Sequence, residues 1–549
     1  MLESVRTRKP FRDGFQLLPQ SVWANWGSII QDADEEEEEV QRFKYEQQLD
    51  RSFLSKSSVI GLGFGLMSPV LGMSTTMSIG LLNGGPLTIV IGFLINGIAT
   101  WLCSLSLGEI VSRFPIELHG GSAMLARQKF KLACSWFTGW LMLLGNWTMS
   151  TSITFAGAQL LVSLVTMTND KLIGENYIVV TTVLAFYLIV TIVGLINLKF
   201  AGFIETVNKV CVYWIVYAVI FIDILLLLFH SGKYRSLKYA LAHFDNSFSG
   251  YSSAALSFII GFQQSSFTLQ GFSMLPALAD EVKESERDIP KGMSTAVLTS
   301  TVTGVVFLLP IMLILPDTQT IINNPKVMPI ALIFTQSTHS IFVSLFLVIM
   351  ILGNLLFSGI GSVTTSSRAV YSMSRDMALP YSEFWSYVDP SSKHRVPKNS
   401  ILLSMGISYL LGLLALLSTA AFNAFMGAAV LCLCSATCIP LVLVLISRRR
   451  ALRGSPIKVR YRLGWFVNIA SILWLVFTMV VICIPPQVPV TFSSMNYAFV
   501  VYLLFLAAIT VLYFRWGRYN FKTPLISEDS RTDDTASASF VLQDANLPK

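Results

Sequence analysis

The sequence predicts an all-α membrane protein with twelve transmembrane helices. Its 549 residues are 53% hydrophobic and only 13% charged, and the mean hydropathy is +0.62. A soluble domain carries about 25% charged residues, whereas this chain repeats apolar runs of roughly 20 residues, the length that crosses a bilayer. Two of these runs are interrupted by polar residues, proline and glycine, a pattern typical of transporters.

Each predicted span is an apolar run long enough to cross the hydrocarbon layer as a helix, and polar or glycine-containing segments separate the runs. In chain order the predicted spans cover residues 58–82, 87–109, 134–166, 177–198, 203–229, 251–279, 294–316, 341–372, 400–419, 421–447, 465–486 and 496–514. They form one membrane domain, residues 57–514. The polar segments 1–56, with the acidic run Glu35–Glu39, and 515–549 are expected to be disordered cytosolic tails.

The first and sixth spans contain residues that interrupt a helix. The first has Ser68, Pro69 and Gly72 in its middle. The sixth has Gln263–Ser266 followed by Gly271. A broken helix leaves backbone N–H and C=O groups that lipid cannot satisfy, so buried protein, a ligand or an ion must supply the partners. Two breaks five spans apart predict an inverted five-helix repeat, with substrate bound where the breaks meet.

The distribution of positive charge favours one orientation. With a cytosolic N-terminus, most loop Lys and Arg residues, including Arg448–Arg450, fall on the cytosolic side, and few, such as Lys233 and Lys238, fall outside. The positive-inside rule therefore predicts that both termini are cytosolic. The net charge of +7 follows from these loops, so it does not indicate a nucleic-acid partner.

Several motifs carry a resemblance to a known family. They are the segment Gly61–Thr75 in the first span and the later segments Gly84–Pro86 and Ser106–Glu109. The first of them resembles the broken first helix of the amino acid–polyamine–organocation superfamily, and the other two continue the likeness. The segment Pro485–Thr491 is more specific, because it resembles the fungal branch of permeases for GABA, choline and polyamines.

The resemblance implies two inverted five-helix repeats of the bacterial leucine transporter type plus two extra helices. It implies substrate bound between helices 1 and 6, flanked by helices 3 and 8, and alternating access that is usually coupled to protons. It also implies a monomer in the plasma membrane, with the vacuolar membrane as the alternative. The chain departs from many relatives at Ser273 and Ala277, where they carry Asp and His. An anionic contact for a cationic amine is therefore missing from that position.

The candidate substrate-binding residues lie at the two breaks. Half-helix N-termini point N–H groups at anions, whereas free C=O groups and aromatic faces suit an ammonium. The candidate set is Met67, Ser68, Pro69, Gly72, Ser265, Ser266, Phe267, Gly271 and Ser273. Phe272, Trp140 and Trp147 are further aromatic candidates, for which ordinary packing is the alternative.

Three residues are candidates for the coupling ion. Asp223 lies among Ile and Leu residues, and a charge inside the membrane is costly enough to indicate function, here neutralising an amine or carrying a proton. The alternative places Asp223 at the outer interface. Ser358 and Ser362 offer hydroxyls that could coordinate a cation, although small hydroxyl residues also mediate close helix packing.

These observations favour a secondary active transporter, a proton-coupled permease for a small amine or amino acid such as GABA, choline or a polyamine. The alternative is a transporter-like nutrient sensor without significant transport. An enzyme would need acid–base or metal residues gathered at one depth, which the sequence does not offer. No cofactor or metal is expected, since the cysteines lie in apolar spans without a nearby His. The expected partners are the substrate, protons and the lipid bilayer.

Overall fold

The computed structural model describes residues 49–50, 53–168, 177–324, 327–389, 395–417, 419–491 and 495–523. Within these ranges the chain is helical, and its only β-type pairings are the isolated bridges Leu54–Val282 and Gly84–Asp245. The expected all-α class is therefore confirmed. The predicted disorder of the tails concerns residues that lie mostly outside these ranges.

Among the described residues, ten helices are long and apolar enough to cross a membrane. Several are composite: the first joins α2 (Lys56–Leu66) and α3 (Pro69–Thr75), and the last joins α20 (Ala498–Leu512) to a π-helical turn and α21 (Arg518–Asn520). The others contain α5 (Phe93–Arg113), α7 (Lys131–Thr168), α8 (Ile178–Lys199), α9 (Ile204–Phe229), α12 (Ser285–Leu313), α15 (Ile341–Arg375), α18 (Thr419–Ile446) and α19 (Tyr461–Cys483).

Two further predicted spans are also helical but do not meet the same length criterion. One is α17 (Lys398–Leu417), of which Lys398–Leu414 forms a shorter apolar helix. The other consists of α11 (Ala254–Leu269) followed directly by a 3₁₀ helix, Gln270–Glu281.

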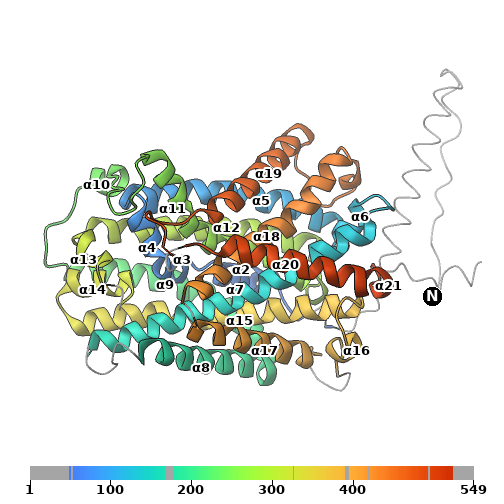
Figure 1. Cartoon of the computed structure of the whole chain (residues 1–549), viewed down its shortest axis with the longest axis horizontal. Coiled ribbons are helices and arrows are strands. Elements are labelled where there is room, and N and C mark those ends of the chain that lie inside the picture. Colours follow the sequence, from blue (N-terminus) through green and yellow to red (C-terminus); the bar gives the residue numbers. More distant parts are fainter. Residues whose placement is uncertain are drawn as a thin grey trace, which may run out of the picture. The chain divides into compact units, whose positions relative to one another are not determined.

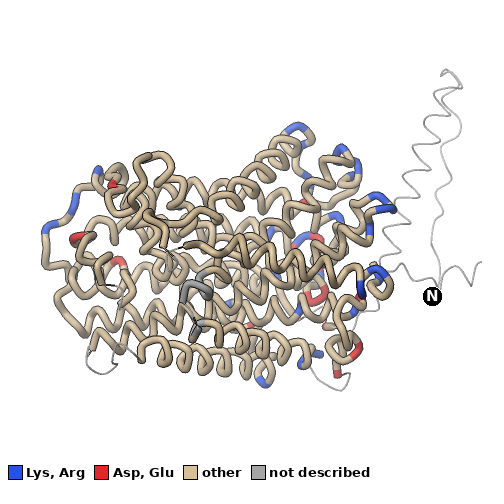
Figure 2. Tube along the Cα trace, in the orientation of Figure 1, with Lys and Arg blue, Asp and Glu red and all other residues tan. Residues whose placement is uncertain are grey.

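The long helices run side by side in Figure 1, and short helices gather at the two ends of the bundle. One end, called here the α10 end, carries α4 (Met77–Leu82), α10 (Leu237–Ala242), α13 (Thr318–Ile322) and α14 (Pro329–Thr338). The opposite end, called the α6 end, carries α6 (Leu118–Leu125) and α16 (Ser382–Trp385). Figure 2 shows that charged residues concentrate near these ends and are sparse between them, as a lipid environment requires.

Burial separates central helices from peripheral ones. Most of Lys56–Thr75 is buried inside the bundle, whereas little of Ala498–Asn520 is. The peripheral helices expose large apolar side chains, for example Leu184, Leu228 and Leu504, which are more than 60% exposed. Because apolar surface of this kind is stable in lipid, these faces form the boundary with the acyl chains.

Two helix ends differ from the predicted ones. Helix α12 begins at Ser285 rather than at residue 294, because Glu286 and Asp288 in its first turn interact favourably with the helix dipole. The last span continues past residue 514 to Asn520. The indole of Trp516 donates a hydrogen bond to Met377 O (3.2 Å), and Phe521 packs edge-on against Trp136, so tertiary contacts extend the helix.

Candidate functional site

The first span is broken between Leu66 and Pro69, as the sequence predicted for Ser68 and Pro69. Gly72 was expected to interrupt the helix too, but it lies within α3, where it allows a close helix contact instead. Proline has no N–H to donate and disfavours helical geometry in the residue before it, and Ser68 accordingly has φ −50° and ψ 108°. The break frees carbonyl groups at the C-terminus of α2. One of them, Gly65 O, accepts a hydrogen bond of 2.6 Å from Ser358 Oγ on α15.

The sixth span is interrupted later than predicted. Gln263–Ser266 were expected to break the helix, but α11 continues through them to Leu269, and the change to 3₁₀ geometry begins at Gln270. Their polar side chains find partners on other helices instead. Gln263 Nε2 donates to Val481 O and Ile484 O (2.8 and 2.7 Å), and Asn96 Nδ2 donates to the hydroxyls of Ser265 and Ser266 (2.7 and 3.0 Å).

The two interrupted spans touch at two glycines. A Cβ added at Gly271 would lie 3.1 Å from Leu66 Cβ and from Met67 Cγ, and one added at Gly72 would lie 2.6 Å from Thr268 Oγ1. No larger residue fits at Gly72 without displacing its neighbour. Glycine at these positions therefore permits the close approach of the α2–α3 break to the end of α11.

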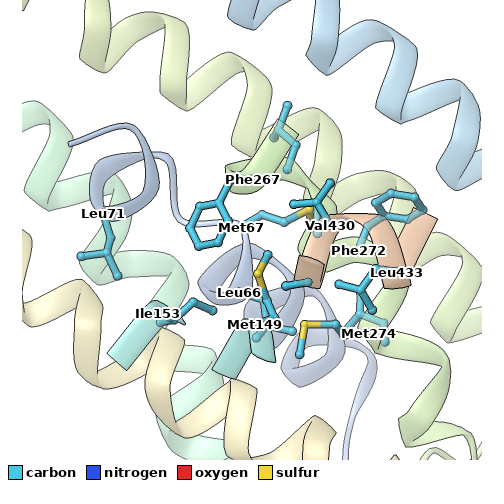
Figure 3. Close-up of a cluster of buried hydrophobic side chains, with 14 of the residues drawn as sticks. Leu66, Met67, Leu71, Met149, Ile153, Phe267, Phe272, Met274, Val430 and Leu433 are labelled. Carbon is cyan, nitrogen blue, oxygen red and sulfur yellow. The ribbon is translucent and has the colours of Figure 1, made fainter. Parts of the chain in front are cut away.

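A small cavity of about 20 Å³ lies where the breaks meet. Four predicted residues line it, namely Ser68, Gly72, Phe267 and Ser358. Figure 3 shows Phe267 and Met67 from the two interrupted spans close together, with Met149 and Ile153 of α7 beside Leu66. The volume accommodates about one water molecule and is far below the 300–1,000 Å³ of typical ligand pockets, so the site is contracted in this conformation.

The remaining predicted substrate residues lie around this cavity without lining it. Met67 and Pro69 form the break itself and are buried. Ser265 and Ser266 face Asn96, and Ser273 Oγ donates to Gln270 O (2.9 Å). Of the further aromatic candidates, Phe272 is buried, Trp140 packs against Trp136, and Trp147 donates to Ser404 Oγ (3.2 Å).

The coupling-ion candidates occupy separate places. Ser362 Oγ lies 3.0 Å from Ser150 Oγ of α7 and close to the turn of α15 that carries Ser358. Asp223 lies in α9, is 8% exposed, and its Oδ1 has no hydrogen-bond partner among the described residues. It lines neither the small cavity nor the larger one described below.

Several cavity residues could not be singled out from the sequence. Leu71, Thr75, Met149, Ile153 and Thr268 line the cavity. Thr75 and Thr268 sit one turn from predicted break residues, so their spacing offered a weak signal. Met149 and Ile153 belong to a long apolar helix in which nothing distinguishes a cavity-facing residue from a packed one.

A larger cavity of about 820 Å³, called here the vestibule, extends from Phe267 and Thr75 to the α10 end. Phe267 and Thr75 line both cavities and therefore separate them. No described residue that lines the vestibule is charged, and its polar groups include the amides Gln159, Gln263, Gln487 and Asn496. Both N–H groups of Gln263 are engaged by backbone carbonyls, which leaves its Oε1 as an acceptor.

Ion pairs close the bundle on the other side of the small cavity, toward the α6 end. Arg368 of α15 pairs with Glu281 (3.0 Å), and both side chains are buried. Further along α15, Arg375 pairs with Asp280 and with Glu117 (3.1 Å). These contacts join the 3₁₀ helix and the segment before α6 to α15.

Asp280 lies between charges of both signs at this closure. It pairs with the Arg375 guanidinium and also lies beside the Glu117 carboxylate. His119 Nε2, 2.7 Å from Asp376 Oδ2, adds a second contact between α6 and the end of α15. Among the described residues no group of His, Cys, Asp and Glu could hold a metal ion.

Comparison with known proteins relates the membrane domain to one family of permeases. The amino acid permease family model matches residues 58–528. A polyamine transporter of Saccharomyces cerevisiae is 66% identical over 532 residues, which cover 96% of this chain and 86% of the relative. An amino-acid permease of Arabidopsis thaliana is 30% identical (88% and 95% covered), and a choline transporter of S. cerevisiae is 28% identical (91% and 90%).

Proposed function

The chain belongs to the amino acid permease family, and from that membership we propose that it is a secondary active transporter that carries a polyamine across a membrane. The transporter assignment, rather than an enzymatic one, follows from the named relatives, all of which are transporters or permeases. The polyamine assignment takes its support from the 66% identical relative.

The observation that carries the proposal is the meeting of two interrupted spans at a cavity that adjoins the vestibule, where none of the described lining residues is charged. The C-termini of α2 and α11 both end at the breaks, so the negative ends of their dipoles face this region. Carbonyl groups, the Phe267 ring and amide oxygens such as Gln263 Oε1 suit a primary or secondary ammonium. Neutral acceptors of this kind hold a cation without trapping it, which a transporter requires.

We propose twelve membrane helices, the ten long ones together with α17 and the composite span of α11 and its 3₁₀ helix. In this arrangement the first ten form two inverted five-helix repeats of the leucine transporter type, and α19 and α20 lie outside the repeats. The crossing of the first and sixth spans at Gly72 and Gly271 supports this arrangement.

Transport would proceed by alternating access. The vestibule reaches the α10 end, while Arg368, Arg375 and their acidic partners close the α6 end. The α6 end also carries the basic run Arg448–Arg450, and the positive-inside rule supports a cytosolic position for that end and for both termini. The vestibule would then face outward, with a monomer in the plasma membrane or, alternatively, the vacuolar membrane.

Protons are the proposed coupling ion. Asp223 is the strongest candidate carrier, because its Oδ1 is buried with no hydrogen-bond partner among the described residues, and an ionised carboxyl inside the membrane is costly. Ser358 and Ser362 lie at or beside the first break and remain candidates for a coordinated cation. Asp223→Asn would retain downhill exchange of substrate but lose stimulation by a pH gradient.

The test is uptake by purified protein in liposomes. Labelled spermidine, putrescine, choline and GABA are supplied with an acidic exterior, and protein-free liposomes provide the background. We expect polyamine uptake that a protonophore abolishes. Uptake that survives collapse of the gradient would refute proton coupling, and failure of folded protein to take up any of the four would favour the sensor alternative.

A further inference from the structure

A third cavity lies on the periphery of the bundle, away from the substrate site. It is a groove of about 860 Å³ between α8 and α17, bordered at the α6 end by Phe384 and Trp385 of α16. It is called here the α8–α17 groove. Its volume is within the range of small-molecule sites, about 300–1,000 Å³. None of its lining residues lines the small cavity or the vestibule.

The groove is continuous with the lipid-facing surface. Leu402, Leu410 and Leu413 of α17 line it and are each 47% or more exposed. On α8, Leu184 and Leu188 next to the groove are similarly exposed. Because a helix face of this composition contacts acyl chains, the groove opens into the bilayer and its occupant comes from the membrane.

The floor of the groove is open at Gly406. A Cβ added there would meet no atom within 4 Å, which distinguishes it from Gly412 on the same helix, whose added Cβ would lie 2.3 Å from Phe186. Gly412 is therefore a packing glycine, whereas Gly406 leaves space that the protein itself does not fill. A flat, rigid body can lie against such a surface.

The two tyrosine hydroxyls in the groove have oxygens that can accept a hydrogen bond, but their own hydrogens are already used. Thr191 Oγ1 donates to Tyr187 O (2.7 Å), so in its contact with Tyr409 (2.8 Å) the tyrosine hydroxyl must donate. Tyr187 OH in turn donates to Tyr409 O (3.2 Å). Both phenol hydrogens are thus used, and among the described residues no donor reaches either phenol oxygen.

These acceptors select the chemistry of the occupant. Thr191 lies eight residues before Lys199, the end of α8, and therefore about 12 Å from that end at 1.5 Å per residue. A charged head group at that depth is costly, and an acyl chain offers no hydrogen-bond donor. A mainly apolar molecule with one neutral hydroxyl carries no charge into the bilayer and still offers a hydrogen-bond donor. A fused-ring body also loses less conformational freedom on binding than a flexible chain.

We propose that the α8–α17 groove is a binding site for a membrane sterol, whose hydroxyl donates its one hydrogen to the Tyr187 phenol oxygen while its ring system lies against Gly406. The site is separate from the proposed substrate path, so it stands whether or not the chain transports polyamines.

Photolabelling of the full-length protein in lipid nanodiscs tests this site. A diazirine-bearing cholesterol is crosslinked, and labelled peptides from α8 and α17 are quantified with and without excess unlabelled ergosterol. We expect labelling that ergosterol displaces, and a loss of at least about fivefold in Gly406→Phe, which fills the groove. Tyr187→Phe, which keeps the ring and removes one acceptor, should weaken labelling roughly two- to tenfold.

Val302→Phe provides the matched control, because Val302 is 58% exposed on α12 and lies outside the groove. All variants must match the wild type in size-exclusion profile. Unchanged labelling in Gly406→Phe, or absence of labelling in the wild type, would overturn the proposal. So would preferential labelling by a diazirine phosphatidylcholine that ergosterol does not displace, since that result would identify an acyl chain as the occupant.

Discussion

Phe267 is an aromatic side chain that lines both the small cavity and the vestibule, and it therefore lies on the proposed path of the amine. Phe267→Leu keeps an apolar side chain but removes the π face. A cation–π contact contributes about 0.5–2 kcal/mol, so KM for polyamine uptake should rise roughly 2- to 30-fold with little change in the maximal rate. Initial uptake rates over a range of substrate concentrations measure this effect.

Phe267→Tyr is the conservative control, because it retains the ring and should keep KM close to that of the wild type. A Leu variant with unchanged KM would show that Phe267 contributes only packing.

Gly271 tests the close approach of the interrupted spans. Gly271→Ala places a Cβ 3.1 Å from Leu66 and Met67, and we expect a several-fold loss of uptake, whereas Gly271→Leu should abolish it while the protein still reaches the membrane. The matched control is Gly92→Ala, whose Cβ would meet its nearest atoms at an ordinary 3.8 Å. Uptake and surface expression are measured together. Normal uptake by Gly271→Leu would exclude this contact from the transport site.

The sequence predicts the role of a residue that changes its own backbone conformation. It does not predict the role of a residue whose partners come from distant parts of the chain. Pro69 interrupts a helix wherever it stands in the interior, so the first break was predictable. Ser265 and Ser266 were assigned to a break, yet Asn96, 169 and 170 residues away in sequence, satisfies them within an intact helix. Nothing local to the sequence encodes that partnership.

At the scale of elements, the closure of the α6 end depends on how α15, the 3₁₀ helix and α6 meet. Asp280 faces Arg375 and Glu117 there, with Tyr371 on α15 close by. Removing one member of a buried ion pair leaves the other charge without that partner, so this contact should contribute to the stability of the closed α6 end.

Asp280→Asn replaces the carboxyl with a neutral group of similar shape. The change takes one carboxylate partner from Arg375, so we expect the variant to unfold at a lower temperature than the wild type. Thermal unfolding of detergent-purified protein at pH 7 measures this. Glu383→Gln, an exposed acid at the same end, is the control and should unfold at the wild-type temperature. An Asp280→Asn protein as stable as the wild type would show that this pair contributes nothing measurable to the closure.

Element positions followed from hydropathy, because the cost of exposing polar backbone to lipid acts on every span alike. The residues at which helices begin and end did not follow from hydropathy, because they depend on individual contacts. Helix α12 extends toward its acidic first turn at Glu286 and Asp288, and α21 is held by the packing of Phe521 on Trp136. Both segments are too polar to be recognised as parts of membrane helices from composition.

At the scale of the whole molecule, the two ends of the bundle should be accessible from opposite sides of the membrane. Lys238→Cys at the α10 end should react with a membrane-impermeant thiol reagent in intact cells. Arg453→Cys at the α6 end should react only after permeabilisation. Both positions are exposed, while the seven native cysteines are buried or partly buried and give the background. The reverse pattern would invert the proposed orientation.

The fold class was predictable because it depends on sums over many residues, such as the apolar fraction and the repeated apolar runs of roughly 20 residues. The conformation of the cavity between the interrupted spans was not predictable from the sequence. Whether the cavity at Ser68 and Phe267 is contracted or open depends on contacts such as Arg368–Glu281, between residues 87 positions apart. The family resemblance predicted a site between the first and sixth spans but could not predict which state the chain adopts.

The uncharged lining of the vestibule, among the residues the structure describes, has a kinetic consequence. A polycation approaching an acidic funnel is drawn in over several ångströms, and its capture slows steeply as ionic strength rises. A vestibule with a neutral lining does not attract the cation over a distance, so the substrate reaches it by diffusion alone. Capture by this protein should therefore vary little with added salt, and it should depend on the concentration of the solute on the vestibule side.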